Sequence, residues 1–156
     1  MEKEVKISIE EGQGVMTGVD VAVFDNEERV LLGKRLSKVG YGQWGFPGGH
    51  LKKDEKLLEA AKRELIEELG DEIKINMSKD ILGIRENRAE PYKLHHVVPM
   101  LKGEYVSGEA KVNEPSRCEK WEWFDLDNLP SPLFSGIKET LENYKNNKAT
   151  IITDWE

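Results

Sequence analysis

The pattern of apolar and polar positions along the chain predicts several strands. β-Branched and apolar residues dominate two early stretches, 15–25 and 29–35, and the polar turn "DNEE" lies between them. Apolar runs that are bounded by turn residues are typical of strands, and two runs across a short turn are typical of a strand pair. Four later stretches have the same character, at residues 72–77, 81–87, 93–106 and 120–126.

A different spacing predicts a helix over residues 54–69, with Asp54 as its N-cap and Gly70 as its end. Its apolar residues recur at steps of three and four and form one stripe, made of Leu58, Ala61, Leu65 and Leu69. Residues 132–147 predict a closing helix, whereas residues 148–156 fit no element. One helix between strands and one after them predict an α/β fold with a mixed sheet covered on both faces.

The loop before the first helix, residues 36–50, contains five glycines and one proline in fifteen residues. This composition argues against a regular element there. Trp44 and Phe46 are too large and apolar to be spacers, so we expect a loop of defined shape in which both rings mainly pack against the core. Without a Cβ, the glycine backbone of "GFPGGH" can approach a phosphate or offer a carbonyl to a metal ion.

Three carboxylates, Glu64, Glu67 and Glu68, follow one another closely on the first predicted helix. At about 100° per residue they fall together beside the apolar stripe, so they can converge on one point at the edge of the core. Like charges at this spacing cost a helix only about 0.2–0.5 kcal/mol per pair. Taken alone, the cluster is therefore more typical of a solvated helix face than of a site.

Bulk composition narrows the class of protein. The length of 156 residues suits one domain over residues 1–156, and 38% hydrophobic with 34% charged residues is typical of a globular chain. We expect no membrane span, no secretory leader and a cytoplasmic location, in which the single cysteine, Cys118, packs as a small apolar residue. A net charge of −7 argues against coating a nucleic acid duplex but not against a small phosphorylated ligand.

The glycine loop and the helix together contain a spaced motif: Gly49, five residues, Glu55, seven residues and then "RELIEELG". This is the pattern G-x5-E-x7-R-E-U-x-E-E-x-G-U, in which U is aliphatic, and through it the chain resembles the Nudix hydrolase family. The last position departs from the pattern, because Asp71 stands where the family has an aliphatic residue. We expect Ile73 to do the packing instead.

The resemblance implies a Nudix-type α/β/α sandwich, a mixed sheet between helices, and a site that holds Mg²⁺ or Mn²⁺. It implies that Arg63 orients the carboxylates and that Glu55 braces the loop. A further glutamate before the last strand often completes such a site, and Glu114 is the candidate here. The implied metal ligands are Glu64, Glu67, Glu68 and the carbonyl of Gly48, and the implied catalytic residues are Glu67, Glu64, Arg63 and Glu114.

Outside the motif the resemblance extends over about residues 15–147 and is strongest to the MutT-related branch, which cleaves nucleoside triphosphates, including modified or oxidised purine nucleotides. It implies hydrolysis between the α and β phosphates to a monophosphate and pyrophosphate. The arginine matching Arg35 lies near the phosphates in that branch. Gly48, Gly49 and Phe46 are the other residues expected to contact a small-molecule nucleotide.

Three alternatives remain open from the sequence. An ADP-ribose or nucleotide-sugar pyrophosphatase usually has a proline soon after the motif, and none lies between Asp71 and Glu90. A non-hydrolytic nucleotide-binding module would commonly lack one of the metal-binding glutamates, and a calcium-stabilised structural domain would bind metal without turnover. The sequence leaves monomer and homodimer equally open. His95 and His96 are adjacent in a predicted strand, so they point to opposite faces and cannot chelate one ion together.

Overall fold

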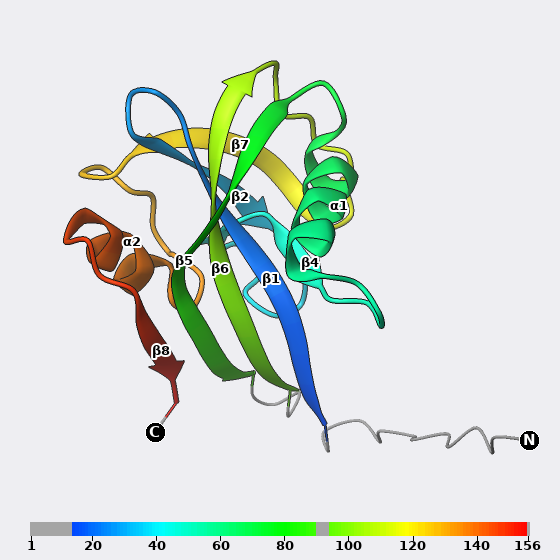
Figure 1. Cartoon of the computed structure of the whole chain (residues 1–156), viewed down its shortest axis with the longest axis vertical. Coiled ribbons are helices and arrows are strands. Elements are labelled where there is room, and N and C mark those ends of the chain that lie inside the picture. The colour runs from blue at the N-terminus through cyan, green and yellow to red at the C-terminus, as the bar shows by residue number, and fades with distance from the viewer. Residues whose placement is uncertain (1–13, 90–93, 156) are drawn as a thin grey trace, which may run out of the picture.

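Within residues 14–89 and 94–155, which the computed structural model describes, eight strands form one mixed sheet (Figure 1). The strands are β1 Val15–Phe24, β2 Arg29–Arg35, β3 Trp44–Gly45, β4 Gly48–His50, β5 Lys74–Ala89, β6 Leu94–Ser107, β7 Cys118–Asp125 and β8 Thr150–Asp154. The main order is β3-β2-β1-β6-β5-β8, with β4 paired to β1 and β7 paired to β2. β1 runs parallel to β6 and β5 runs parallel to β8, while the other pairs are antiparallel.

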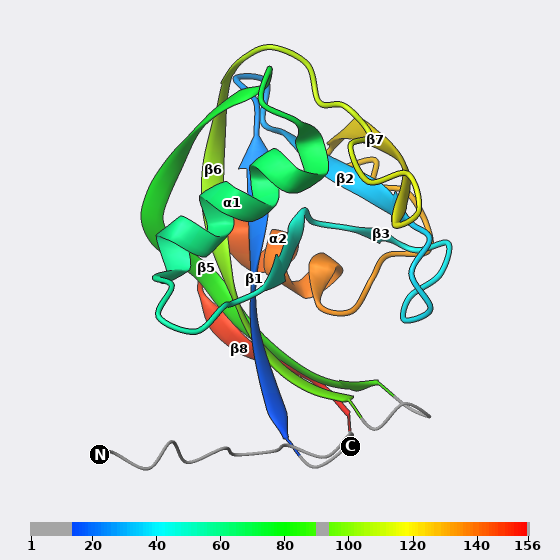
Figure 2. The same ribbon diagram turned by 90° about the vertical axis from the view of Figure 1, so that its right-hand side faces the viewer.

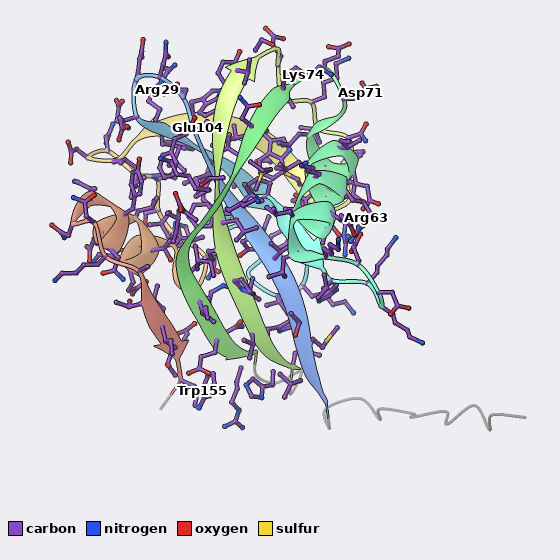
Figure 3. All side chains as sticks on the ribbon, in the orientation of Figure 1. Arg29, Arg63, Asp71, Lys74, Glu104 and Trp155 are labelled. Atoms are coloured by element: carbon purple, nitrogen blue, oxygen red, sulfur yellow. The ribbon has the colours of Figure 1, made fainter. Side chains whose placement is uncertain are left out.

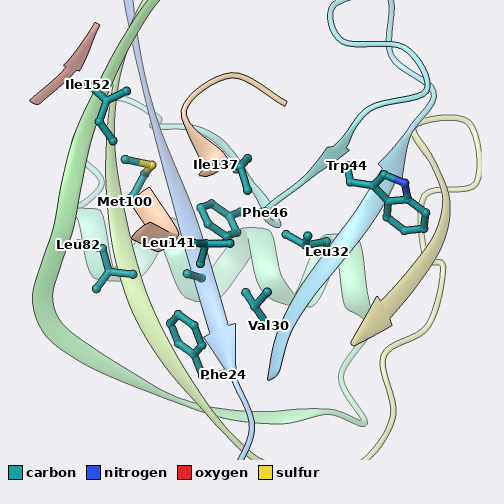
Figure 4. Packing of buried hydrophobic residues seen from close by; sticks show 11 residues of the cluster. Phe24, Val30, Leu32, Trp44, Phe46, Leu82, Met100, Ile137, Leu141 and Ile152 are labelled. Carbon is teal, nitrogen blue, oxygen red and sulfur yellow. The ribbon is translucent and has the colours of Figure 1, made fainter. Parts of the chain in front are cut away.

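Two helices cover opposite faces of this sheet, α1 Leu57–Leu69 and α2 Ile137–Lys145 (Figure 2). Under α1, the apolar stripe of the helix packs on β1 and β6 with the buried residues Val19, Val21, Val23, Ala61, Leu65, Leu69 and Leu101. Under α2, a second cluster includes Trp44 and Phe46 (Figure 4). The predicted α/β/α sandwich with a mixed sheet is therefore confirmed, as is the packing of both aromatic rings of the glycine loop.

The first helix begins at Leu57, so the prediction of Asp54 as its N-cap is wrong. Asp54 has φ 64, in the left-handed region, and belongs to the turn that precedes the helix. Lys56 is the N-cap, and its N–H donates to the Glu59 carboxylate at 3.0 Å. At the other end Gly70 stops the helix as predicted, with φ 83 and its N–H bonded to Ile66 O at 2.9 Å.

Several boundaries also differ from the sequence pattern. The two strands predicted at 72–77 and 81–87 are one long strand, β5, which keeps its pairing with β6 through register shifts. The glycine loop contains two short strands, and α2 is shorter than predicted. The unplaced residues 148–156 include β8, where Ile152 is 8% exposed and packs in the α2 cluster. Ile73 is buried as expected, and so is Cys118.

In the described part of the chain, neither helix has the length and apolar composition needed to cross a bilayer.

Candidate functional site

The three carboxylates of α1 lie where the helix meets the glycine loop. Glu64 is 7% exposed, Glu68 is partly buried and Glu67 is exposed, and all three line one cleft. The pairing of β4 with β1 holds the loop against the helix, and Gly48 N–H donates to Oε1 of Glu68 at 3.3 Å. The structure thus brings together the helix edge and the loop that the motif predicts.

The two glycines of β4 are required by this close approach. A Cβ on Gly49 would collide with the carboxylate of Glu64, and a Cβ on Gly48 would collide with the backbone oxygen of Val19 and with Asp20. Because only glycine leaves this space free, the backbone of β4 can lie directly against the acidic side chains. This is the physical reason for glycine at the start of the motif.

Arg63 projects from α1 (Figure 3) and forms ion pairs with Glu55, Glu64 and Glu67. Its Nη1 donates to Glu64 Oε1 at 2.7 Å and to Glu67 Oε2 at 3.2 Å, and its Nη2 donates to the backbone oxygen of His50 at 2.9 Å. The same guanidinium donates twice to Glu55, whose Oε1 also accepts from Lys52 N–H at 3.1 Å. These contacts are compatible with the roles that the resemblance implies for Arg63 and Glu55, which remain predictions.

The pKa values of Glu55 and Glu68 shift in opposite directions. The hydrogen bonds from Arg63 lower the pKa of Glu55 to about 2, and Glu55 in turn raises the pKa of Arg63. Burial raises the pKa of Glu68 to about 8, and the negative charges of Glu64, Asp20 and Glu114 add to this rise. Burial is the main reason why the charged form of Glu68 is disfavoured, and repulsion from these three acids is a further one.

The donor set fits a hard divalent cation. Carboxylate oxygens with a backbone carbonyl are the ligands that Mg²⁺ and Mn²⁺ prefer, and such an ion would offset the repulsion of Glu68 by its acidic neighbours. In residues 14–89 and 94–155, no three His, Cys, Asp or Glu side chains are already arranged to hold a metal ion. Arg63 donates to one oxygen of Glu64 and to one oxygen of Glu67. A metal ion would compete with these two hydrogen bonds.

The cleft has a volume of about 490 Å³, and basic side chains line it together with the acids. Arg35 is one of them, at the end of β2. Its Nε and Nη2 both donate to the backbone oxygen of Val39, at 3.2 and 3.0 Å, and its Cζ lies 4.0 Å from the centre of the Phe134 ring. Burial lowers the pKa of Arg35. Lys38 and Arg117 also line the cleft, so phosphate groups would meet positive charge here.

The two remaining predicted residues, Glu114 and Phe46, also line the cleft. Glu114 lies before β7, where its backbone oxygen accepts from Arg117 N–H and Cys118 N–H at 2.9 and 3.1 Å. Phe46 is 6% exposed and packs in the α2 cluster. The site residues named from the sequence are thus gathered in one cleft, and their roles remain predictions.

Sequence reasoning missed a second polar group in the cleft, made of Asp20, Arg85 and Asn87. Arg85 is 5% exposed and Asn87 is 4% exposed, and all three residues line the cleft. Nη2 of Arg85 donates to Oδ2 of Asp20 at 3.0 Å. The signal was present, because Asp20 interrupts the apolar run of β1 and Arg85 follows the apolar start of "ILGIREN".

The histidines divide as predicted. His96 lines the cleft, where its Nε2 lies 3.3 Å from Nε2 of His50, whereas His95 makes an edge contact with Trp155 at 5.2 Å between ring centres. His96 therefore faces the cleft, whereas His95 packs against Trp155. The contact between His96 and His50 was not predicted. It depends on the pairing of β4 and β6 with β1, which brings the two residues together and has no local signal in the sequence.

Comparison with known proteins gives the same family as the motif. The model of the NUDIX domain matches residues 15–144. The m7GpppN-mRNA hydrolase NUDT17 of Danio rerio is 32% identical over an alignment of 133 residues, and the match covers 74% of this chain and 43% of that protein. The RNA pyrophosphohydrolase of Bartonella henselae is 28% identical over an alignment of 149 residues, and the match covers 75% of this chain and 80% of that protein. The chain therefore spans less than half of the zebrafish relative.

Among solved structures, a MutT NUDIX hydrolase from Burkholderia pseudomallei is similar with a TM-score of 0.73 and 34% sequence identity. The match covers 83% of this chain and 97% of that chain. It has the same arrangement of a mixed sheet between helices.

Proposed function

The chain belongs to the Nudix family of hydrolases, and we propose that it is a metal-dependent pyrophosphohydrolase that cleaves nucleoside triphosphates to a monophosphate and pyrophosphate. Hydrolysis of a pyrophosphate linkage in a nucleotide substrate is supported by the names of both relatives. The substrate class and the metal are our proposal.

The observation that carries the proposal is the Arg63 network on the wall of the cleft. It gathers Glu55, Glu64 and Glu67 beside glycines whose missing Cβ lets the loop lie directly against Glu64. Arg35, Lys38 and Arg117 line the same cleft, so the substrate would lie between an acidic and a basic wall. A phosphoanhydride carries concentrated negative charge, and its hydrolysis requires such positive charge around the phosphates.

Each residue of the cleft has a proposed role in metal binding, positioning or phosphate binding. Glu64, Glu67, Glu68 and the carbonyl of Gly48 would hold Mg²⁺ or Mn²⁺. When bound, the ion neutralises phosphate oxygens and lowers the pKa of water. Arg63 fixes the positions of the carboxylates, and Arg35 binds the phosphate chain.

One water molecule is consumed in the reaction. Its oxygen forms the new bond to phosphorus while the bond between the α and β phosphates breaks and pyrophosphate leaves. A carboxylate outside the metal ligands is needed to accept the proton of that water. Glu114 suits this role because it lines the cleft from the loop before β7, which is hydrogen-bonded to the C-terminal end of α1 through Asn113. We expect the enzyme to work on a small nucleotide, as a monomer or a homodimer in the cytoplasm.

The test is a substrate panel with Mg²⁺ and product identification by chromatography and phosphorus NMR. The panel holds the nucleoside triphosphates, 8-oxo-dGTP, ADP-ribose, nucleotide sugars, and short RNAs with a triphosphate or a cap at the 5′ end. Monophosphate plus pyrophosphate from one triphosphate class is the expected result. Turnover of only the diphosphate-linked compounds or the RNAs would overturn the substrate assignment but keep the chemistry.

A variant pair separates catalysis from structure. Glu67→Gln should abolish hydrolysis without loss of thermal stability, because the exposed side chain of Glu67 adds little to the core. Glu142→Gln, the same change at an exposed position of α2, should leave hydrolysis unchanged. Unchanged turnover in Glu67→Gln would contradict the metal-site assignment. Tight nucleotide binding without any turnover in the wild type would instead indicate a recognition module.

A further inference from the structure

The polar group that the sequence did not predict lies on the wall of the cleft formed by β5 and β1. Arg85 and Asn87 are two positions apart on β5, so their side chains share one face of the strand. Asp20 lies on β1, opposite Gly48 of β4 in the strand pairing. Since Gly48 also contacts Glu68, the new group adjoins the acidic part of the cleft without belonging to it.

Packing and polar contacts both hold Arg85 in place. The stem of Arg85 lies against Gly136, where a Cβ would be 2.7 Å from Cδ, and its guanidinium lies 5.2 Å from the Phe134 ring centre. Its Nε is buried and has no hydrogen-bond partner among the described residues. A buried ionic network of this kind contributes little to stability compared with apolar residues of the same size, so a recognition role explains it better.

The hydrogen-bonding capacity of the pair can be derived from its internal contact. Nη1 of Arg85 donates to Oδ1 of Asn87. This orientation of the amide is dictated by chemistry, because a guanidinium only donates and the amide nitrogen cannot accept. The amide oxygen therefore faces Arg85, and the N–H groups of Asn87 remain for another partner. Arg85 adds donors of its own, so the pair offers the cleft hydrogen-bond donors.

A surface that offers only hydrogen-bond donors can distinguish one purine base from another. Guanine and hypoxanthine carry two neighbouring acceptors, O6 and N7, on one edge, whereas adenine carries the acceptor N7 beside the donor N6 amino group. Two donors match the first edge and repel the amino group of the second. Asp20 and Asn87 line the same cleft as the acids of α1, so a bound nucleotide can reach both regions at once.

We propose that Arg85 and Asn87 form the base-reading part of the site and select purine nucleotides with an oxygen at position 6 over those with an amino group. The proposal rests on the proposed function in that it assumes a nucleotide whose phosphates lie at the α1 carboxylates. Asp20 acts as a positioning residue, because its ion pair with Arg85 fixes the guanidinium.

The test compares inosine triphosphate with ATP, which differ in the groups at position 6 and in the protonation of N1. We expect kcat/KM of the wild type to favour inosine triphosphate by about tenfold or more, since one well-placed pair of base contacts discriminates by that much. Asn87→Asp retains an acceptor for Arg85 and gives the cleft a second acceptor in place of the amide donors. It should reduce the preference by about tenfold, mainly through KM.

Asn76→Asp is the matched control, because Asn76 is an exposed residue of the same strand and is absent from the cleft lining. It should keep the wild-type preference. Equal kcat/KM for the two nucleotides in the wild type would overturn the proposal, and so would an unchanged preference in Asn87→Asp. If Asn87→Asp does not fold, the wild-type comparison still decides.

Failure of the proposed function would be separately visible. If the wild type hydrolyses only diphosphate-linked compounds, the same comparison is made with GDP-linked and ADP-linked sugars. If it hydrolyses nothing, calorimetric affinities for IMP and AMP replace kcat/KM. A preference for IMP would then support base reading in a protein that is not a pyrophosphohydrolase, and equal affinities would overturn both.

Discussion

The guanidinium of Arg63 holds the carboxylate of Glu55 through two hydrogen bonds, 2.7 Å from Nε to Oε2 and 3.0 Å from Nη2 to Oε1. Two parallel bonds fix the plane of the arginine as well as its distance. With that plane fixed, Nη1 points at Glu64 and Glu67. The contact with Glu55 therefore fixes the direction from which Arg63 meets the carboxylates of Glu64 and Glu67.

Arg63→Lys should lower kcat by at least about tenfold, because an ammonium group keeps the charge but cannot make the paired contacts. We expect a smaller effect on thermal stability, since Arg63 and Glu55 lie toward the surface. Steady-state kinetics with a Mg²⁺ titration measures the change. Arg29→Lys is the control, because Arg29 pairs with Asp25 in a turn away from the cleft. Equal kinetics of Arg63→Lys and wild type would contradict an orienting role.

Gly49→Ala should reduce activity by about a hundredfold, since the new Cβ must displace Glu64 and a displacement of about 1 Å at a reacting centre costs about that much. Gly45→Ala is the matched control in the same loop, because a Cβ there would lie 3.5 Å from its nearest neighbours, at ordinary contact distance. The two variants are compared by kcat and by melting temperature. A fully active Gly49→Ala protein would show that the carboxylate tolerates other positions.

Much of this site could be predicted from the sequence because its residues are close together in the chain. The helical period alone places Glu64, Glu67 and Glu68 on one side of α1, and the fixed spacing from Gly49 brings the loop to them. The contacts of Arg63 and Glu55 span only eight residues. Local geometry therefore determines this half of the cleft, and the sequence pattern contains it.

The other half depends on strand pairing, which the sequence pattern does not contain. Arg85 contacts Asp20 across 65 residues, and this contact exists only because β6 lies between β1 and β5 in the sheet. The same holds for β8, whose residues are exposed apart from Ile152. Its position follows from the parallel pairing with β5. Neither relationship has a local signal that would give a register.

The stability of the metal-free protein should fall as the pH rises from about 5 to about 8. The pKa of Glu68 is about 8 in the folded protein against 4.5 without the fold, so the folded form binds the proton more tightly. The stabilisation from the bound proton is complete below the unfolded pKa of 4.5 and is lost as the pH rises through the folded pKa of about 8. The total loss in the free energy of unfolding is a few kcal/mol, at about 1.4 kcal/mol per pKa unit.

Melting temperatures in EDTA across this pH range measure the effect. Glu68→Gln should remove the slope, because glutamine resembles the protonated acid at every pH. Glu142→Gln should retain it. A wild-type slope that persists in Glu68→Gln would assign the proton to another group.

Binding of Mg²⁺ should release a proton near neutral pH. In the metal-free protein Glu68 is largely protonated at pH 7, because burial and its acidic neighbours raise its pKa to about 8. A cation beside a carboxylate favours the ionised form, so binding must expel this proton.

Calorimetry in two buffers of different ionisation enthalpy gives the number of protons released. We expect this number to approach one at pH 7 and to vanish at about pH 10, where Glu68 is already ionised. Glu68→Gln should bind Mg²⁺ more weakly and release no proton. Release that is absent at pH 7 in the wild type would mean that the ion does not share the site with Glu68.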